Sequence, residues 1–314
     1  MSNKIKKINL SHSFIFFLFA NIFSLIIFKL NNYNISPLVC LIMILIIGVT
    51  HGSHDHIKGK RLFKILNIKQ FSFFYLFYIL IAILVIIIWI LAPLISLLSF
   101  LIIASYHFGK EDTQFLINKS SVLNLFLYLF KGFLIILAPL YFHFNETVSI
   151  FKFLLVDDEA FYSTLEFIET NKILTIGVIL STLSSIFLFV KEFQIKKFVI
   201  FFDYFSILIL NYYLSPLVAF TIYFCFLHSI RHGISLIHEI DNLNFVNGLV
   251  IFIKKALPLT GLTAILCFMA IFFLNNSFDL NSSILKVIFI GLASLTFPHI
   301  LLEYLLEKNE KQRN

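Results

Sequence analysis

The chain has 314 residues, of which 60% are hydrophobic and only 13% are charged. So little polar surface cannot coat a soluble globule of this size, and the composition therefore predicts a protein of the lipid bilayer. A net charge of +7 would favour nucleic-acid binding in a soluble protein. Here the basic residues form short runs between hydrophobic segments, which is the pattern of membrane topology. We therefore expect no nucleic-acid partner.

The hydrophobic segments predict membrane-spanning helices, since a span needs about 20 predominantly apolar residues. The longest run, residues 71–108, is divided at Ala92 and Pro93 because proline cannot continue a helix. A single helix over this run would be about 57 Å long, roughly twice the hydrocarbon thickness. We expect an all-α polytopic transmembrane helix bundle of about ten spans, forming a single integral membrane domain over residues 1–314. The predicted spans are 13–30, 35–51, 71–91, 94–108, 122–142, 173–190, 197–213, 215–238, 257–275 and 283–305.

The distribution of basic residues indicates the orientation of these spans. If the N-terminus is cytoplasmic, the inner segments collect most of the 24 Lys and Arg residues, as the positive-inside rule requires. The one long outer loop, about 143–172, is acidic instead. The pattern predicts that both termini are cytoplasmic and that the chain is a multi-pass protein of the inner (plasma) membrane. The basic residues outside this pattern are Lys29, Lys131, Lys152, Lys172 and Lys286.

The three cysteines do not suggest a disulfide framework. Cys40, Cys225 and Cys267 all lie inside apolar stretches and show no metal-type spacing. We therefore interpret them as packing residues.

The histidines gather on one side of the predicted membrane. All ten except His143 fall in the inner half under this topology, and four separate helices contribute. Ionisable groups at membrane depth are costly, so such histidines usually face the bundle interior and have a partner or a function. The alternative for any one of them is a structural role, in which the imidazole hydrogen-bonds a neighbouring helix.

One histidine pair has a spacing that suits metal binding. His228 and His232 are four residues apart, so they share a helical face at about 5–6 Å, and both rings can bind one ion. With His51 and His107 from other helices they offer a set of neutral nitrogen donors, which suits iron, copper, nickel or zinc rather than magnesium or calcium. Because no ligand charge neutralises the metal, we favour ferrous iron that binds dioxygen beside an apolar substrate. The ligand types alone do not exclude zinc.

Acidic and basic residues lie next to these histidines. Asp55, four residues after His51, is predicted to orient an imidazole through its far N–H, or else to be a carboxylate at the inner surface. Glu111 and Asp112 are either orienting groups of the same kind or solvated charges at a helix end. Arg231 is expected to extend to lipid headgroups.

These motifs, in this order, resemble the Brp/Blh family of bacterial and archaeal β-carotene 15,15'-dioxygenases. In that family a His-Gly-x-x-Asp element, a His-Phe-Gly element followed by acidic residues, a His-x-x-x-His pair and a late Pro-His element recur. The sequence departs from the family at Ser53 and His54, where Ala and Leu are usual, so His54 is an additional or competing candidate ligand. The corresponding stretches here are 51–55, 107–112, 228–232 and 298–299.

The resemblance implies an iron-dependent (Fe2+) enzyme that splits all-trans-β-carotene at its central 15,15' double bond with O2. The products would be two all-trans-retinal molecules, passed to a microbial rhodopsin. The resemblance also implies that His51, His107, His228 and His232 bind the metal, and it leaves open whether His299 binds metal or shapes the site. Because β-carotene is a hydrocarbon that resides in the bilayer, an embedded enzyme can admit it sideways.

Other functions remain as alternatives at this stage. The nearest is a zinc-dependent intramembrane lipid hydrolase, in which Asp55 or Glu111 handles protons around a bound water. A membrane desaturase or hydroxylase would need additional His-x-x-His-His boxes, which the sequence lacks. A haem carrier needs one imidazole on each side of the porphyrin ring, whereas His228 and His232, one turn apart on a helix, face the same way. The last alternative is a helix bundle whose histidines only pack.

Overall fold

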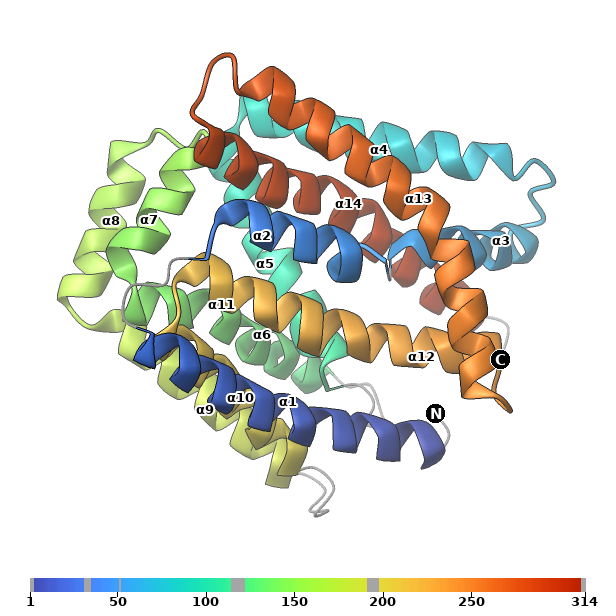
Figure 1. Cartoon of the computed structure of the whole chain (residues 1–314), viewed down its shortest axis with the longest axis horizontal. Coiled ribbons are helices and arrows are strands. Elements are labelled where there is room, and N and C mark those ends of the chain that lie inside the picture. Colours follow the sequence, from blue (N-terminus) through green and yellow to red (C-terminus); the bar gives the residue numbers. More distant parts are fainter. Residues whose placement is uncertain (1–2, 31–34, 51, 114–121, 191–197, 312–314) are drawn as a thin grey trace.

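The computed structural model describes residues 3–30, 35–50, 52–113, 122–190 and 198–311. Over these ranges the chain is helical apart from short turns and contains no strand. Figure 1 shows the helices gathered into one bundle. The helices are α1 (Asn3–Lys29), α2 (Pro37–Met43), α3 (Asp55–Ile65), α4 (Ser72–Leu91), α5 (Pro93–Glu111), α6 (Val122–Phe142), α7 (Phe144–Phe153), α8 (Glu159–Thr170), α9 (Ile173–Val190), α10 (Val199–Tyr213), α11 (Pro216–Ile222), α12 (Ile230–Ile240), α13 (Phe245–Leu274) and α14 (Leu280–Lys311).

The helices confirm the prediction of an all-α polytopic bundle, so the chain is a multi-pass membrane protein. Among the described residues, nine helical stretches are long and apolar enough to cross a membrane. The segment predicted at 197–213 is the apolar helix α10, which is shorter than these, with 15 residues. The break at proline is confirmed, because α4 ends at Leu91 and α5 begins at Pro93.

The bundle has exposed outer helices and a buried central one. The apolar stretches of α4 and α13 are mostly exposed, whereas the stretch from Pro216 to Ile240 is mostly buried. Helix α1 begins and α14 ends at the same end of the bundle (Figure 1). This agrees with termini on one side of the membrane, and the side itself stays a prediction. The three cysteines are free thiols in apolar surroundings, as expected.

Two π-helical turns interrupt predicted spans and pack against each other. Helix α2 continues as a π-helical turn over Ile44–Gly48, and α11 continues as another over Tyr223–Ser229 before α12 begins. Gly48 allows the close approach, since a Cβ there would lie 2.5 Å from the Phe224 ring. The Ser229 hydroxyl donates to the Gly48 carbonyl at 3.3 Å. Such turns are frequent at functional sites, and both of these lie beside the histidines discussed below.

A glycine pair joins α5 to α6. A Cβ on Gly109 would lie 1.8 Å from the Tyr128 carbonyl oxygen, and one on Gly132 would lie 1.7 Å from the Ser105 carbonyl oxygen. The two backbones therefore touch at a place where only glycine fits. This contact holds the carboxyl end of α5, which carries His107 and the acidic residues after it.

Candidate metal centre

Four histidines from three parts of the bundle form a continuous row. His107 comes from α5, His228 and His232 from the central helix, and His299 from α14. All are buried. The His107 ring lies 5.3 Å from the His228 ring and 5.3 Å from the His299 ring, and the His299 ring lies 5.7 Å from the His232 ring, between centroids. We call these residues, in the order 228, 107, 299 and 232, the histidine row.

Two rings of the row form hydrogen bonds with buried carboxylates. His299 Nδ1 lies 2.9 Å from both Asp55 oxygens, and His232 Nδ1 lies 3.1 Å from Glu111 Oε2. Because an ionised carboxylate only accepts, each ring donates from Nδ1, and a neutral ring then has its lone pair on Nε2. A carboxylate behind a histidine in this manner is usual for metal ligands.

The other two rings face carboxylates at longer range. His107 Nδ1 lies 3.8 Å from Glu303 Oε2, and His228 Nδ1 lies 3.9 Å from Asp112 Oδ1. Every ring of the row thus has its Nδ1 side towards a carboxylate. The alternative that Glu111 and Asp112 are solvated charges is wrong, because both side chains are largely buried.

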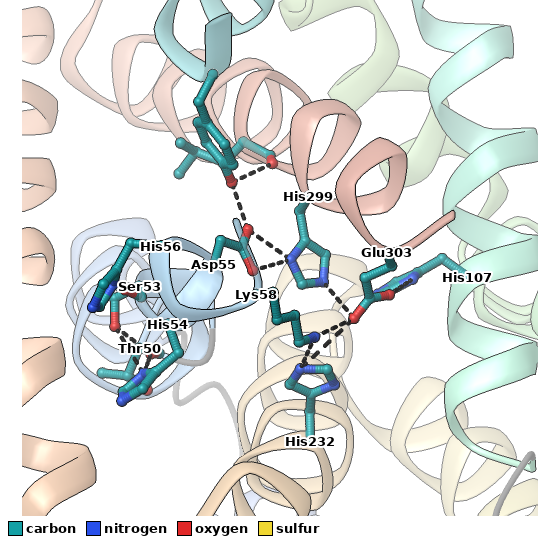
Figure 2. Close-up of polar contacts among 12 residues, drawn as sticks. Thr50, Ser53, His54, Asp55, His56, Lys58, His107, His232, His299 and Glu303 are labelled. Carbon is teal, nitrogen blue, oxygen red and sulfur yellow. Dashed lines mark hydrogen bonds and ion pairs between the residues drawn. The ribbon is translucent and has the colours of Figure 1, made fainter. Parts of the chain in front are cut away.

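Glu303 lies at the centre of the arrangement and was missed by the sequence analysis. Its carboxylate is 3.6 Å from His299 Nε2 and 4.0 Å from His232 Nε2 (Figure 2). Two sets of ligand atoms, each within 4.8 Å of one another, share it: His107, His299 and Glu303, and Glu111, His232 and Glu303. The spacing of His299 and Glu303, four residues apart in an apolar helix, was the signal that could have identified it.

A lysine ammonium lies where these acceptors converge. Lys58 Nζ donates to Glu303 Oε1 and lies 3.3 Å from His232 Nε2 (Figure 2). Lys58 is one of the basic residues expected at the inner surface, yet its side chain is only 16% exposed. Buried imidazole nitrogens and carboxylate oxygens that surround a cation form a donor set that fits a divalent transition metal.

The other candidates from the second predicted span have different positions. His51 lies outside the described residues. The structure does not bring His54 into the row, because its ring stacks on Phe252 at 4.3 Å between centroids and lies away from Glu303 (Figure 2). The prediction that Asp55 orients an imidazole is confirmed, because this buried carboxylate pairs with His299 Nδ1. The Tyr78 hydroxyl donates to Asp55 at 2.8 Å.

Arg231 is buried in the protein interior. The prediction that it extends to lipid headgroups is wrong, because it is 3% exposed and binds Asp203 through both terminal nitrogens, at 2.9 and 3.0 Å. It also donates to Asp112, at 3.3 Å, and Tyr223 donates to the same carboxylate at 2.7 Å. Burial favours the neutral acid, but the neighbouring His228 ring and the Arg231 charge hold the pKa of Asp112 below its ordinary value.

An apolar cavity of about 330 Å³ ends at the histidine row. His107, His228 and His299 belong to its lining, and most of the remaining lining is apolar. Four of its lining residues are more than 40% exposed, two on α4 and two on α13, so the cavity opens between these helices towards the lipid-facing surface. They are Tyr75, Ile79, Leu262 and Leu266. We call this space the lipid-side cavity.

Comparisons with known proteins point to one family. A family profile described as beta-carotene 15,15'-dioxygenase matches residues 42–307, a range that includes the whole histidine row. A curated relative of that name from an uncultured marine bacterium, 66A03, is 33% identical over 128 residues, which is 41% of this chain and 43% of the relative. The matched segment therefore spans less than half of the relative's length. No solved structure matches the chain.

Proposed function

We propose, from the premise that this chain belongs to the beta-carotene 15,15'-dioxygenase family, that it cleaves all-trans-β-carotene at its central double bond with O2 into two all-trans-retinal molecules. The observation that carries the proposal is a buried row of carboxylate-facing histidines at the end of an apolar cavity that opens towards lipid. A hydrocarbon dissolved in the bilayer reaches such a cavity without crossing water.

The proposed metal is ferrous iron, held by His107, His228 and His232, with His51 as the fourth ligand. The Nδ1 contacts with carboxylates support this set because they direct the Nε2 lone pairs away from those carboxylates. The set of His107, His299 and Glu303 is a second possibility, since two histidines and a carboxylate are also typical of non-haem iron. When bound, iron would supply the redox chemistry with dioxygen that no side chain provides.

The protein's own residues perform the positioning. Asp55 and Glu111 fix the tautomer and the ring plane of His299 and His232. Phe108 and Phe224 pack on the His228 ring, at 4.7 and 5.8 Å between centroids, and keep water from that end of the row. The apolar walls of the lipid-side cavity hold the polyene so that one bond lies next to the row.

The product dissolves in lipid, as the substrate does. Retinal is an apolar aldehyde, and the opening between α4 and α13 would return it to the bilayer. We propose that it passes from there to a microbial rhodopsin, and that the membrane is the inner (plasma) membrane.

Expression in a bacterial host that accumulates β-carotene tests this function. Retinal is measured by chromatography of the extracted pigments, with empty vector, His232→Ala and His143→Ala alongside. Retinal with the wild type and with His143→Ala, but not with His232→Ala, is the expected result. Unchanged carotene in cells that contain folded, iron-loaded protein would count against this substrate. Bound zinc with no carotene loss would favour the zinc-dependent lipid hydrolase.

A further inference from the structure

Central cleavage sets a requirement that the lipid-side cavity alone does not meet. If the bond next to the histidine row is the central one, as the proposed function states, equal halves of the polyene extend to both sides of the row. The lipid-side cavity provides space on the side of α4 and α13. Space for the other half is needed elsewhere beside the row.

A second cavity lies next to Phe108, whose ring packs on His228. It has a volume of about 80 Å³ and is lined from α5, α6, α7, α11 and α14, with Ser105 and Thr147 as its polar residues. We call it the distal cavity. Phe108 lines both cavities, and within the described part of the chain no other lining residue is common to the two. The two spaces therefore meet at Phe108.

Aromatic rings separate the two cavities. Phe224 lines the lipid-side cavity and Phe220 the distal cavity, and these rings stack at 5.6 Å with an interplanar angle of 10°. The Phe108 ring lies edge-on to Phe224, at 6.2 Å, and to His228, at 4.7 Å. A turn of Phe108 about its side-chain torsions would join the two spaces next to His228, without a change in the backbone.

We propose that the distal cavity receives one half of the carotenoid, and that Phe108 is the movable partition which sets the length of polyene accepted. The chemistry of the lining fits a hydrocarbon end group, since it offers almost no hydrogen-bonding partner. The volume of about 80 Å³ with the partition in place is consistent with a space that enlarges when the ring turns. An empty apolar space in a close-packed interior costs dispersion contacts, which a bound hydrocarbon would restore.

Filling the distal cavity tests the proposal through substrate length. Ala104 lies one turn before Phe108 on α5, is buried, and lines the distal cavity alone. We compare Ala104→Leu with wild type in kcat/KM for β-carotene and for a β-apocarotenal, which keeps one half intact and has the other half shortened. The ratio of the two values cancels differences in metal content. Because a pocket contact of this size is worth about 10-fold or more, we expect the ratio of β-carotene to β-apocarotenal to fall by about that factor.

A second filling variant and a control accompany Ala104→Leu. Ile136→Phe fills the same cavity from α6 and should shift the ratio in the same direction. Ala160→Leu, at an exposed position on α8 that lines neither cavity, should leave it unchanged.

The outcomes separate this inference from the proposed function. Wild type that cleaves both substrates, with a ratio that Ala104→Leu and Ile136→Phe do not change, would overturn the role of the distal cavity. An equal fall for both substrates would overturn it as well, because filling would then act on the site and not on length. Wild type that cleaves neither substrate would overturn the proposed function and this inference with it.

Discussion

Arg231 and His232 are neighbours in the sequence, yet they belong to two different buried ionic groups. The Arg231 cluster consists of Ser13, Asp112, Asp203, Tyr223 and Arg231. The Glu303 cluster consists of Asp55, Lys58, Glu111, His232, His299 and Glu303. The first joins α1, the end of α5, α10 and the central helix, and the second joins α3, α5, the central helix and α14.

The clusters differ in how charge is matched. In the Arg231 cluster, the guanidinium donates to both oxygens of Asp203 and also to Ser13 and Asp112. The planar group thus has hydrogen-bond acceptors at fixed positions. In the Glu303 cluster, Glu303 has Lys58 as its ammonium partner, while imidazole Nε2 atoms lie around the same carboxylate. The charges of the Arg231 cluster are matched by its own residues, whereas the Glu303 cluster contains sets of ligand atoms close enough together to be candidates for a metal site.

The largest expected effect separates the two candidate metal sets. His107→Ala, His228→Ala and His232→Ala should each reduce iron occupancy and retinal formation by about 100-fold or more, beyond the 10–100-fold typical when only an orienting partner is lost. Metal analysis of purified protein, with His143→Ala as the matched control, checks this. Glu303→Gln should reduce iron occupancy by about 10–100-fold, the loss typical of an orienting partner. Loss of iron as complete as in His232→Ala would identify Glu303 as a ligand and contradict the four-histidine set.

Substitutions in the Arg231 cluster should lower the stability of the protein. Asp203→Ala removes the partner of a buried guanidinium, which costs about 3–5 kcal/mol. Thermal unfolding of the detergent-solubilised protein measures this cost. The matched control is Glu239→Ala, which breaks an exposed ion pair with Arg61 at 3.0 Å and should change stability by about 0–1 kcal/mol. Similar losses in the two variants would show that the Arg231 cluster does not stabilise the bundle.

An intermediate effect is expected at Gly109, because α5 contributes residues to both clusters. A methyl group there would collide with the Tyr128 carbonyl at 1.8 Å, so Gly109→Ala must move α5 from α6. Such overpacking costs about 1–3 kcal/mol. Activity per bound metal should fall as well, since the shift moves His107. Gly261→Ala is the control, because a Cβ at that position meets nothing within 4 Å and alanine favours the helix. Equal activity in both variants would contradict the positional role of the glycine contact.

The smallest effect is expected at the opening towards lipid. Ile79→Trp narrows the space between α4 and α13 and should lower kcat/KM for β-carotene by roughly 3–10-fold, a change typical of one altered apolar contact. Iron content should stay at the wild-type level. Ile87→Trp is the control on the same helix, at an exposed position that does not line the cavity. The same activity in Ile79→Trp and Ile87→Trp would argue for another route of entry.

Local features predicted most of the fold. Apolar runs of sufficient length became helices, and Pro93 divided the longest run. Proline alone does not decide this, because Pro139, Pro258 and Pro298 lie inside helices. The π-helical turns at Ile44–Gly48 and Tyr223–Ser229 were not predicted, because they depend on the packing of two distant segments. The same holds for the approach of Gly109 to Gly132, which has no signature in either helix alone.

The candidate site was predictable as a set of histidines but not as a network. His107 and His228 come together, whereas His232 lies at the other end of the row and contacts it through His299. The partners could not be assigned, since a carboxylate such as Asp203 or Asp55 pairs across helices that are far apart in the sequence. For this reason Arg231 was expected at the membrane surface, although it lies in the interior.

Metal identity and oxygen consumption, measured together on the purified protein, decide whether the histidines hold a redox metal that cleaves β-carotene. We expect close to stoichiometric iron in wild type, oxygen uptake on addition of β-carotene, and formation of retinal. All three should be lost in His232→Ala and kept in His143→Ala. A protein that contains zinc, consumes no oxygen with β-carotene, and loses neither metal nor activity in His232→Ala would contradict the account.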